Sequence, residues 1–198
     1  AFCVKMLGAV RQEVIFARHQ KEVGRPAQWL GFPLIATSHT WENGKNEQSH
    51  QDTTFCESLL GEMHDVMRVL FPADYNSTLA LLPSVYQSRG QLSCMVIAKG
   101  ECPVWMSPHQ AQGEPVMLIA TGAYQLGEML RAARRLFDHD QTWRLVYLQE
   151  PGRFTAPRDD HEAACSASPE EIDALFPAII TRRVMLTHMR PEVMRGHL

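Results

Sequence analysis

The sequence predicts an α/β protein whose mostly parallel sheet carries helices on both faces. Short, continuous apolar segments of strand length alternate with segments of helical periodicity, roughly every 20 to 30 residues. Continuous apolar segments are typical of strands that are buried on both faces. The stretches between them are long enough for right-handed crossovers, which join parallel strands.

The first half of the chain begins with a segment at 2–17 that is apolar on almost every side, and this predicts a largely buried helix. FPLIAT at 32–37 predicts a strand covered on both faces. Thr54 and Glu57, in TFCE, have the spacing of a capping box and predict the start of the next helix. The remaining elements of this half are a strand at 67–71, a helix that carries Leu79, Leu82, Val85 and Tyr86 on one face, and a strand at 92–98.

Residues 101–114 are rich in Pro, Gly and Gln and predict a linker, so we expect two domains, at 1–112 and 113–198. The second domain is α/β in pattern as well. Its predicted elements are strands at 116–121, 143–148 and 182–187, a helix at 125–137 with Arg131, Arg134 and Arg135 opposite an apolar stripe, and a helix that starts at Ser168, Pro169 and Glu171.

Composition argues against several classes of partner. The net charge is −3 and the sequence pI is about 6.3, so no basic face is evident that would attract nucleic acid. No apolar run approaches the roughly 20 residues that a membrane span needs. The cysteines are odd in number and show no metal-type pairing, which predicts reduced thiols. We therefore expect a cytoplasmic protein that binds neither nucleic acid nor a membrane.

One polar segment, SHTWENGKNEQSHQD at 38–52, separates a predicted strand from a predicted helix. Connections of this kind usually have about 2 to 6 residues, and longer ones are often binding loops or disordered. Trp41 and the clustered Asn and His side chains favour an ordered binding loop, with a self-packed surface loop as the alternative. In a parallel sheet the segment would lie at the carboxyl edge of the strands, where ligands bind.

Three side chains at this edge could carry chemistry. His50 can exchange protons near neutral pH, and Asn46 can both donate and accept hydrogen bonds. Lys99, at the end of the third predicted strand, would lie at the same edge and could hold an anionic substrate. The alternatives are a structural histidine and a lysine that marks the exit of the strand into solvent. A metal site at His39, His50 and His64 is disfavoured by their irregular spacing.

These residues resemble the phosphoketolase family of thiamine diphosphate enzymes, whose corresponding loop commonly reads WRxDHNGFSHQDPG. Trp41, Asn46 and SHQD at 49–52 match at the same spacing, and VIAKG around Lys99 resembles the family's VAGKQ. The resemblance covers essentially the whole chain. It implies the end of a pyrimidine-binding-type domain up to about 112, followed by a transketolase-like C-terminal domain.

The resemblance implies an enzyme that cleaves xylulose 5-phosphate or fructose 6-phosphate with inorganic phosphate, giving acetyl phosphate and an aldose phosphate. By that similarity, His50 exchanges a proton at the reacting end of the substrate, Asn46 hydrogen-bonds the substrate or intermediate, and Lys99 binds the substrate phosphate. Phe2, in an opening AF that resembles the family's YEAF, would stack on the aminopyrimidine ring of the cofactor.

The implied cofactors are thiamine diphosphate and Mg²⁺, held mainly by an upstream diphosphate-binding domain outside residues 1–198. The implied assembly is a homodimer, and we expect residues 1–198 on their own to be inactive.

The chain also departs from the family pattern. Lys45, Glu47 and Gln48 replace three residues of the family's HNGF, which changes charge and backbone freedom at the centre of the loop. A noncatalytic assembly or sugar-phosphate-sensing module, and another thiamine enzyme such as a transketolase, therefore remain as alternative functions. A second phosphate ligand is also open, with Lys21 and Arg25 as the candidates.

Overall fold

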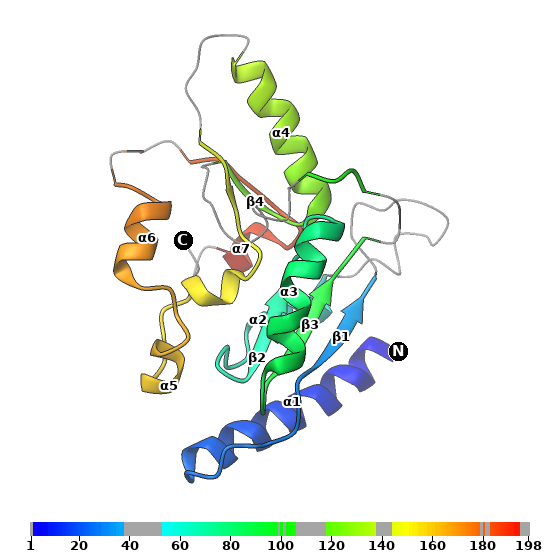
Figure 1. Cartoon of the computed structure of the whole chain (residues 1–198), viewed down its shortest axis with the longest axis vertical. Coiled ribbons are helices and arrows are strands. Elements are labelled where there is room, and N and C mark those ends of the chain that lie inside the picture. Colours follow the sequence, from blue (N-terminus) through cyan, green and yellow to red (C-terminus); the bar gives the residue numbers. More distant parts are fainter. Residues whose placement is uncertain are drawn as a thin grey trace.

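The computed structural model describes residues 2–37, 53–98, 100, 102–105, 118–137, 144–178, 180 and 183–194. These residues form two three-stranded sheets surrounded by helices (Figure 1). Every strand pair in both sheets is parallel within the described residues. The predicted α/β class with parallel strands is therefore confirmed.

The first sheet has the strand order β1-β3-β2, so the last strand of this half lies between the other two. Its strands and helices are α1 (Phe2–Glu22), β1 (Phe32–Ala36), α2 (Thr54–Leu60), β2 (Met67–Leu70), α3 (Tyr75–Gln87) and β3 (Leu92–Val96). The prediction therefore places these elements correctly, with end points that differ by a few residues.

Alternate residues of β2 and β3 point to opposite faces of this sheet. Val69 pairs with Cys94, and both belong to the core shared with α1 and α2. Leu70 pairs with Met95, and both pack against Val85 of α3. Because side chains alternate along a strand, this division places α1 and α2 on one face and α3 on the other. Helices therefore cover both faces, as the sequence predicts.

Helix α1 is longer and less buried than the sequence predicts. Val10, Val14 and Ala17 face the core, whereas Ile15 and Phe16 are 52% and 53% exposed. The prediction of a largely buried helix is therefore wrong for these described side chains. Apolar character on every side indicates how many faces could be covered, but only one face meets the rest of the described chain.

The end of α1 is set by a glycine. Gly24 has a φ of 71°, in the left-handed region that favours glycine. Its N–H donates to the carbonyl of Lys21 at 3.1 Å, and the N–H of Arg25 donates to the carbonyl of Gln20 at 2.8 Å. This pair of hydrogen bonds is a Schellman motif, and it turns the chain toward β1.

The second sheet has the order β5-β4-β6. Its elements are β4 (Ile119–Thr121), α4 (Ala123–Phe137), β5 (Val146–Tyr147), the 3-10 helix η3 (Pro151–Phe154), α5 (Asp160–Ala163), α6 (Pro169–Leu175), β6 (Met185–Thr187) and α7 (Pro191–Met194). The strands are shorter than predicted, and α4 begins two residues before the predicted Gln125.

Two predicted helix starts have different outcomes. Ser168 caps α6 as predicted, because its hydroxyl accepts from the N–H of Glu171, whose carboxylate accepts from the N–H of Ser168. The predicted box at Thr54 and Glu57 is wrong, because Thr54 is the first residue of α2 and Thr53 is its N-cap. The carboxylate of Glu57 bonds elsewhere, as described below.

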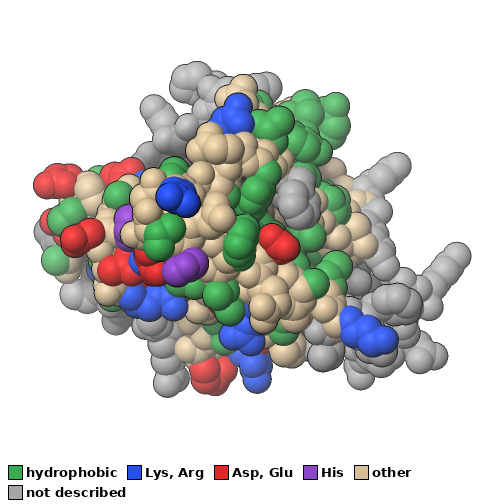
Figure 2. Space-filling model, turned by 90° about the horizontal axis from the view of Figure 1, so that it is seen from below, with side chains coloured by type: hydrophobic (Ala, Val, Ile, Leu, Met, Phe, Trp, Pro, Cys, Tyr) green, Lys and Arg blue, Asp and Glu red, His purple; other side chains and the backbone are tan. Residues whose placement is uncertain are grey.

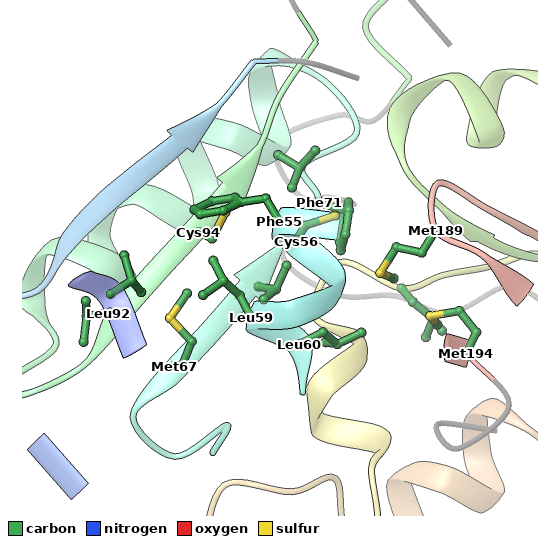
Figure 3. Packing of buried hydrophobic residues seen from close by; sticks show 14 of the residues in the cluster. Phe55, Cys56, Leu59, Leu60, Met67, Phe71, Leu92, Cys94, Met189 and Met194 are labelled. Carbon is green, nitrogen blue, oxygen red and sulfur yellow. The ribbon is translucent and has the colours of Figure 1, made fainter. Parts of the chain in front are cut away.

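One hydrophobic core runs through both halves of the chain. It joins Phe71 of the first half to Val146, Met189 and Met194 of the second. In Figure 3 the two methionines lie beside Leu60 and Phe71. None of the described helices has the length and apolar character that crossing a membrane requires.

Candidate active-site edge

The carboxyl ends of β1 and β3 lie side by side. Ala36 pairs with Val96, and the N–H of Ile97 donates to the carbonyl of Ala36 at 2.9 Å. The 38–52 segment follows Thr37, and Lys99 follows Ala98. The two stretches predicted to carry chemistry therefore leave the sheet from neighbouring strands at the same edge, which we call the candidate edge.

The predicted site residues themselves lie mostly outside the described residues. This holds for His50 and Asn46 in the 38–52 segment, and for Lys99. Phe2 is the first residue of α1, but its side chain is not described. The structure thus places the described residues that flank these positions. The roles of His50, Asn46, Lys99 and Phe2 stay predictions.

The 38–52 segment rejoins the described fold at the first turn of α2. There the Thr53 hydroxyl donates to Glu57 Oε1 at 2.7 Å. Phe55 and Cys56 are buried in the core. The segment therefore has a fixed exit at the end of β1 and a fixed return at α2.

Glu57 is a charged side chain in the first turn of α2, where the 38–52 segment rejoins the fold. Its carboxylate accepts three hydrogen bonds from Arg190, one from the backbone N–H at 2.9 Å and two from the guanidinium at 3.0 and 2.6 Å. Burial alone would raise the pKa of Glu57, but the bonds from Arg190 and Thr53 hold that pKa below its usual value. Glu57 is therefore a carboxylate at neutral pH.

The chain beyond Lys99 is fixed by Asp74. One carboxylate oxygen of Asp74 caps α3 by accepting from the N–H of Ser77 at 2.8 Å. The other accepts from the N–H of Trp105 at 2.7 Å. The indole of Trp105 lies against Gly127 of α4, where a Cβ atom would come within 3.0 Å of the ring. In sequence, Lys99 therefore lies between β3 and Trp105, whose backbone is held by Asp74.

The two candidates for a second phosphate ligand do not lie at the candidate edge. Lys21 donates to Asp65 at 2.8 Å, and Asp65 precedes β2, at the amino edge of the sheet. Arg25 is exposed and lies between α1 and the amino end of β1. On the face seen in Figure 2, basic and acidic side chains of the described residues lie interspersed, and no broad basic patch is visible there.

A cavity of about 260 Å³ lies where the two halves meet, lined in part by Glu62, His64 and Arg158. His64 is buried, and its Nε2 lies 2.9 Å from the carbonyl of Glu162. Arg158 donates to the Glu162 carboxylate at 2.9 Å and to the Glu62 carbonyl at 2.7 Å. These hydrogen bonds join the two halves beside the cavity.

No group of three or more His, Cys, Asp or Glu side chains within the described parts of the chain could hold a metal ion. The buried thiol of Cys94 has a pKa raised by burial, so it is neutral and a poor nucleophile. Within the described residues there is therefore no cluster of metal-binding side chains of this kind, and Cys94 is not a candidate nucleophile.

Comparison with known families decides the relationship. The profile of the D-xylulose 5-phosphate/D-fructose 6-phosphate phosphoketolase family matches residues 1–88. A probable phosphoketolase from Streptomyces avermitilis is 28% identical over 84% of this chain. This chain is a distant homologue of the phosphoketolases. The family resemblance predicted from the 38–52 segment is therefore confirmed.

The similarity to phosphoketolases covers a limited part of those proteins. The matches cover between about a tenth and a quarter of the length of the curated relatives, with 23% of the Streptomyces avermitilis protein covered. Probable phosphoketolase 1 from Rhizobium meliloti is 32% identical over 44% of this chain and 11% of its own length.

A crystal structure of a transketolase mutant from Pichia stipitis has a TM-score of 0.55 with this chain, at 15% identity. The similarity covers 79% of this chain and 25% of that structure, and it shows a transketolase-like fold.

Proposed function

We propose that the protein that carries this chain is a phosphoketolase-like lyase. It cleaves xylulose 5-phosphate or fructose 6-phosphate with inorganic phosphate, giving acetyl phosphate, an aldose phosphate and water. The supporting observation is the pairing of Ala36 with Val96. Because of this pairing, the 38–52 segment and the stretch that leads to Lys99 follow neighbouring strands at the same carboxyl edge of the sheet. This is the edge at which α/β sheets bind ligands.

In this proposal the candidate edge supplies the groups that face the substrate. His50 moves a proton at an oxygen of the reacting carbon chain, a role worth about 10²- to 10⁴-fold in rate. Asn46 orients the same end of the substrate by hydrogen bonding, and Lys99 holds the phosphate by charge. Phe2 would pack on the aminopyrimidine ring of the cofactor.

Thiamine diphosphate supplies the carbanion and the electron sink when it is bound. Because this chain covers only 23% of the Streptomyces avermitilis phosphoketolase, the proposal assigns the diphosphate–magnesium site to an upstream domain of a longer protein. It also includes a second copy of the protein as partner. The exposed apolar side of α1, with Ile15 and Phe16, offers a surface for either contact.

Trapping of acetyl phosphate with hydroxylamine tests the proposal. The protein that carries this chain is incubated with thiamine diphosphate, Mg²⁺, inorganic phosphate and fructose 6-phosphate or xylulose 5-phosphate. Hydroxamate that forms only when inorganic phosphate is present supports the lyase. If folded, cofactor-loaded protein forms no hydroxamate, the proposed lyase activity is wrong.

The loop departures favour one other candidate, a noncatalytic sugar-phosphate-sensing module. Lys45, Glu47 and Gln48 stand where the family's HNGF has other residues. Binding of fructose 6-phosphate without any product, measured by calorimetry on the same protein, would favour the sensing module. Transfer of the two-carbon unit to an aldose phosphate in place of phosphate would instead indicate a transketolase.

A further inference from the structure

The second half of the chain contacts the first turn of α2, where the 38–52 segment returns. Strand β6 ends at Thr187, and the residues after it run across this turn. Met189 is 3% exposed and shares a core with Phe55 and Leu60 of α2. Figure 3 shows Met189 and Met194 on the side of α2 that faces away from β3.

The polar part of this contact is one carboxylate with four donors. Glu57 has a side chain only 4% exposed, while that of Arg190 is 68% exposed. Arg190 supplies three of the donors, and the Thr53 hydroxyl supplies the fourth. Hydrogen bonds to a buried charge are directional and strong, so they fix the position of the helix start more narrowly than apolar contact does.

We propose that Glu57 and Arg190 are positioning residues for the candidate edge. Arg190, three residues after the end of β6, holds the first turn of α2 and thereby sets the point at which the segment that carries Asn46 and His50 rejoins the fold. This inference rests on the proposed function for its effect on catalysis. Its structural half, that Arg190 fixes the start of α2, stands on the contacts alone.

A second ion pair provides a matched control. Arg68, near the amino end of β2, donates to Glu150 of the second half at 2.7 and 3.0 Å. This pair also joins the two halves through a bidentate guanidinium, but Arg68 pairs in register with Ser93, away from the carboxyl edge. Loss of either ion pair should weaken the contact between the two halves. Only loss of the Arg190 pair should also increase the mobility of the first turn of α2.

The test compares Arg190→Gln, Arg190→Lys and Arg68→Gln in the protein that carries this chain. Hydrogen–deuterium exchange of the 53–60 amides reports on the start of α2, and kcat and KM for fructose 6-phosphate report on the edge. Arg190 is mostly exposed, so its replacement leaves no cavity, and both Arg190 variants should fold.

We expect Arg190→Gln to speed exchange at 53–60 by about tenfold or more, the scale expected for loss of charge-assisted hydrogen bonds. It should lower kcat by about tenfold, with Arg190→Lys restoring most of both and Arg68→Gln changing neither. Equal effects of Arg190→Gln and Arg68→Gln on exchange would overturn the inference. If the unmodified protein forms no acetyl phosphate, the proposed lyase fails, and the exchange data still decide whether Arg190 positions α2.

Discussion

At the scale of single residues, the proposal depends most directly on His50. Replacing His50 by Ala removes the proposed proton donor and acceptor while leaving the described core unchanged. We expect kcat for acetyl phosphate formation to fall by roughly 10² or more. Steady-state assays with fructose 6-phosphate measure this, with His39→Ala in the same segment as the control. An unchanged kcat would make His50 a structural or surface residue.

Glu57 should make the fold sensitive to acid. Its pKa in the folded protein is lower than its usual value of 4.5, because Arg190 and Thr53 outweigh the effect of burial. Its stabilising effect is therefore present above about pH 4.5 and is lost as pH falls through the lowered pKa. The free energy of unfolding in urea should drop more gently with acidification in Glu57→Gln than in the unmodified chain.

Glu13 lies exposed on α1, and Glu13→Gln serves as the control for this acid series. Its pH dependence should follow that of the unmodified chain. Identical curves for Glu57→Gln and Glu13→Gln would show that the Glu57 contacts do not contribute to stability.

Two glycines with similar backbone angles should respond differently to replacement by Ala. Gly24 and Gly90 have φ of 71° and 61°, and a Cβ atom at Gly90 would lie 2.8 Å from the carbonyl oxygen of Ala27. Gly24→Ala should cost only backbone strain, about 1 kcal/mol, whereas Gly90→Ala adds a clash and should cost about 2 kcal/mol or more. Chemical denaturation measures both, and equal losses would refute the clash.

Sequence patterns could locate some of these residues but not their partners. The SPEE motif identifies Ser168 and Glu171 because both ends of that contact lie within one turn of helix. Glu57 and Arg190 are 133 positions apart, so no local spacing connects them. The same local rule assigned Glu57 to a capping box with Thr54, which the tertiary contact overrides.

At the scale of elements, the start of α3 combines two contacts that sequence spacing did not reveal. Asp74 caps the helix and also accepts from the N–H of Trp105. Loss of a cap costs about 1 kcal/mol, and a buried N–H left unpaired costs about 1–3 kcal/mol more. Asp74→Ala should therefore destabilise the chain by about 2–4 kcal/mol, measured by urea unfolding.

Ser168→Ala, which removes an exposed cap of α6, is the matched control and should cost about 1 kcal/mol. A loss for Asp74→Ala no larger than that for Ser168→Ala would mean that the Trp105 contact adds no stability.

Most helices and strands of this chain are predictable because their apolar periodicity is strong and their lengths fit. The amphipathic stripe of α4 shows this, with Leu126, Met129 and Ala133 buried and Arg131 and Arg134 exposed. The exposure of α1 was not predictable, because periodicity says which faces are apolar and not what covers them. Strand lengths in the second sheet were overestimated, since an apolar run can continue past the last ladder hydrogen bond.

At the scale of the whole molecule, the described core does not divide at the predicted linker. The second half contributes Ile119, Val146, Leu148, Phe176, Met189 and Met194 to the same cluster as α1, α2 and the first sheet. A fragment of residues 1–112 would expose the apolar surface that these side chains cover.

We expect the 1–112 fragment to show no cooperative urea transition and to bind a hydrophobic dye. Adding the 113–198 fragment should restore a transition, because it returns the missing core side chains. Circular dichroism and dye fluorescence measure both effects. A cooperative transition in 1–112 alone, with no dye binding, would show that the first half folds independently.

The shared core also bears on how the protein acquires its fold during synthesis. The strands of the first sheet emerge from the ribosome long before Met189 and Met194, which pack against α2. Contacts between residues so far apart in sequence form late and slow folding. The first sheet is therefore partly uncovered until residues 189–194 have been synthesised, and a chaperone that binds exposed apolar surface would find its target there.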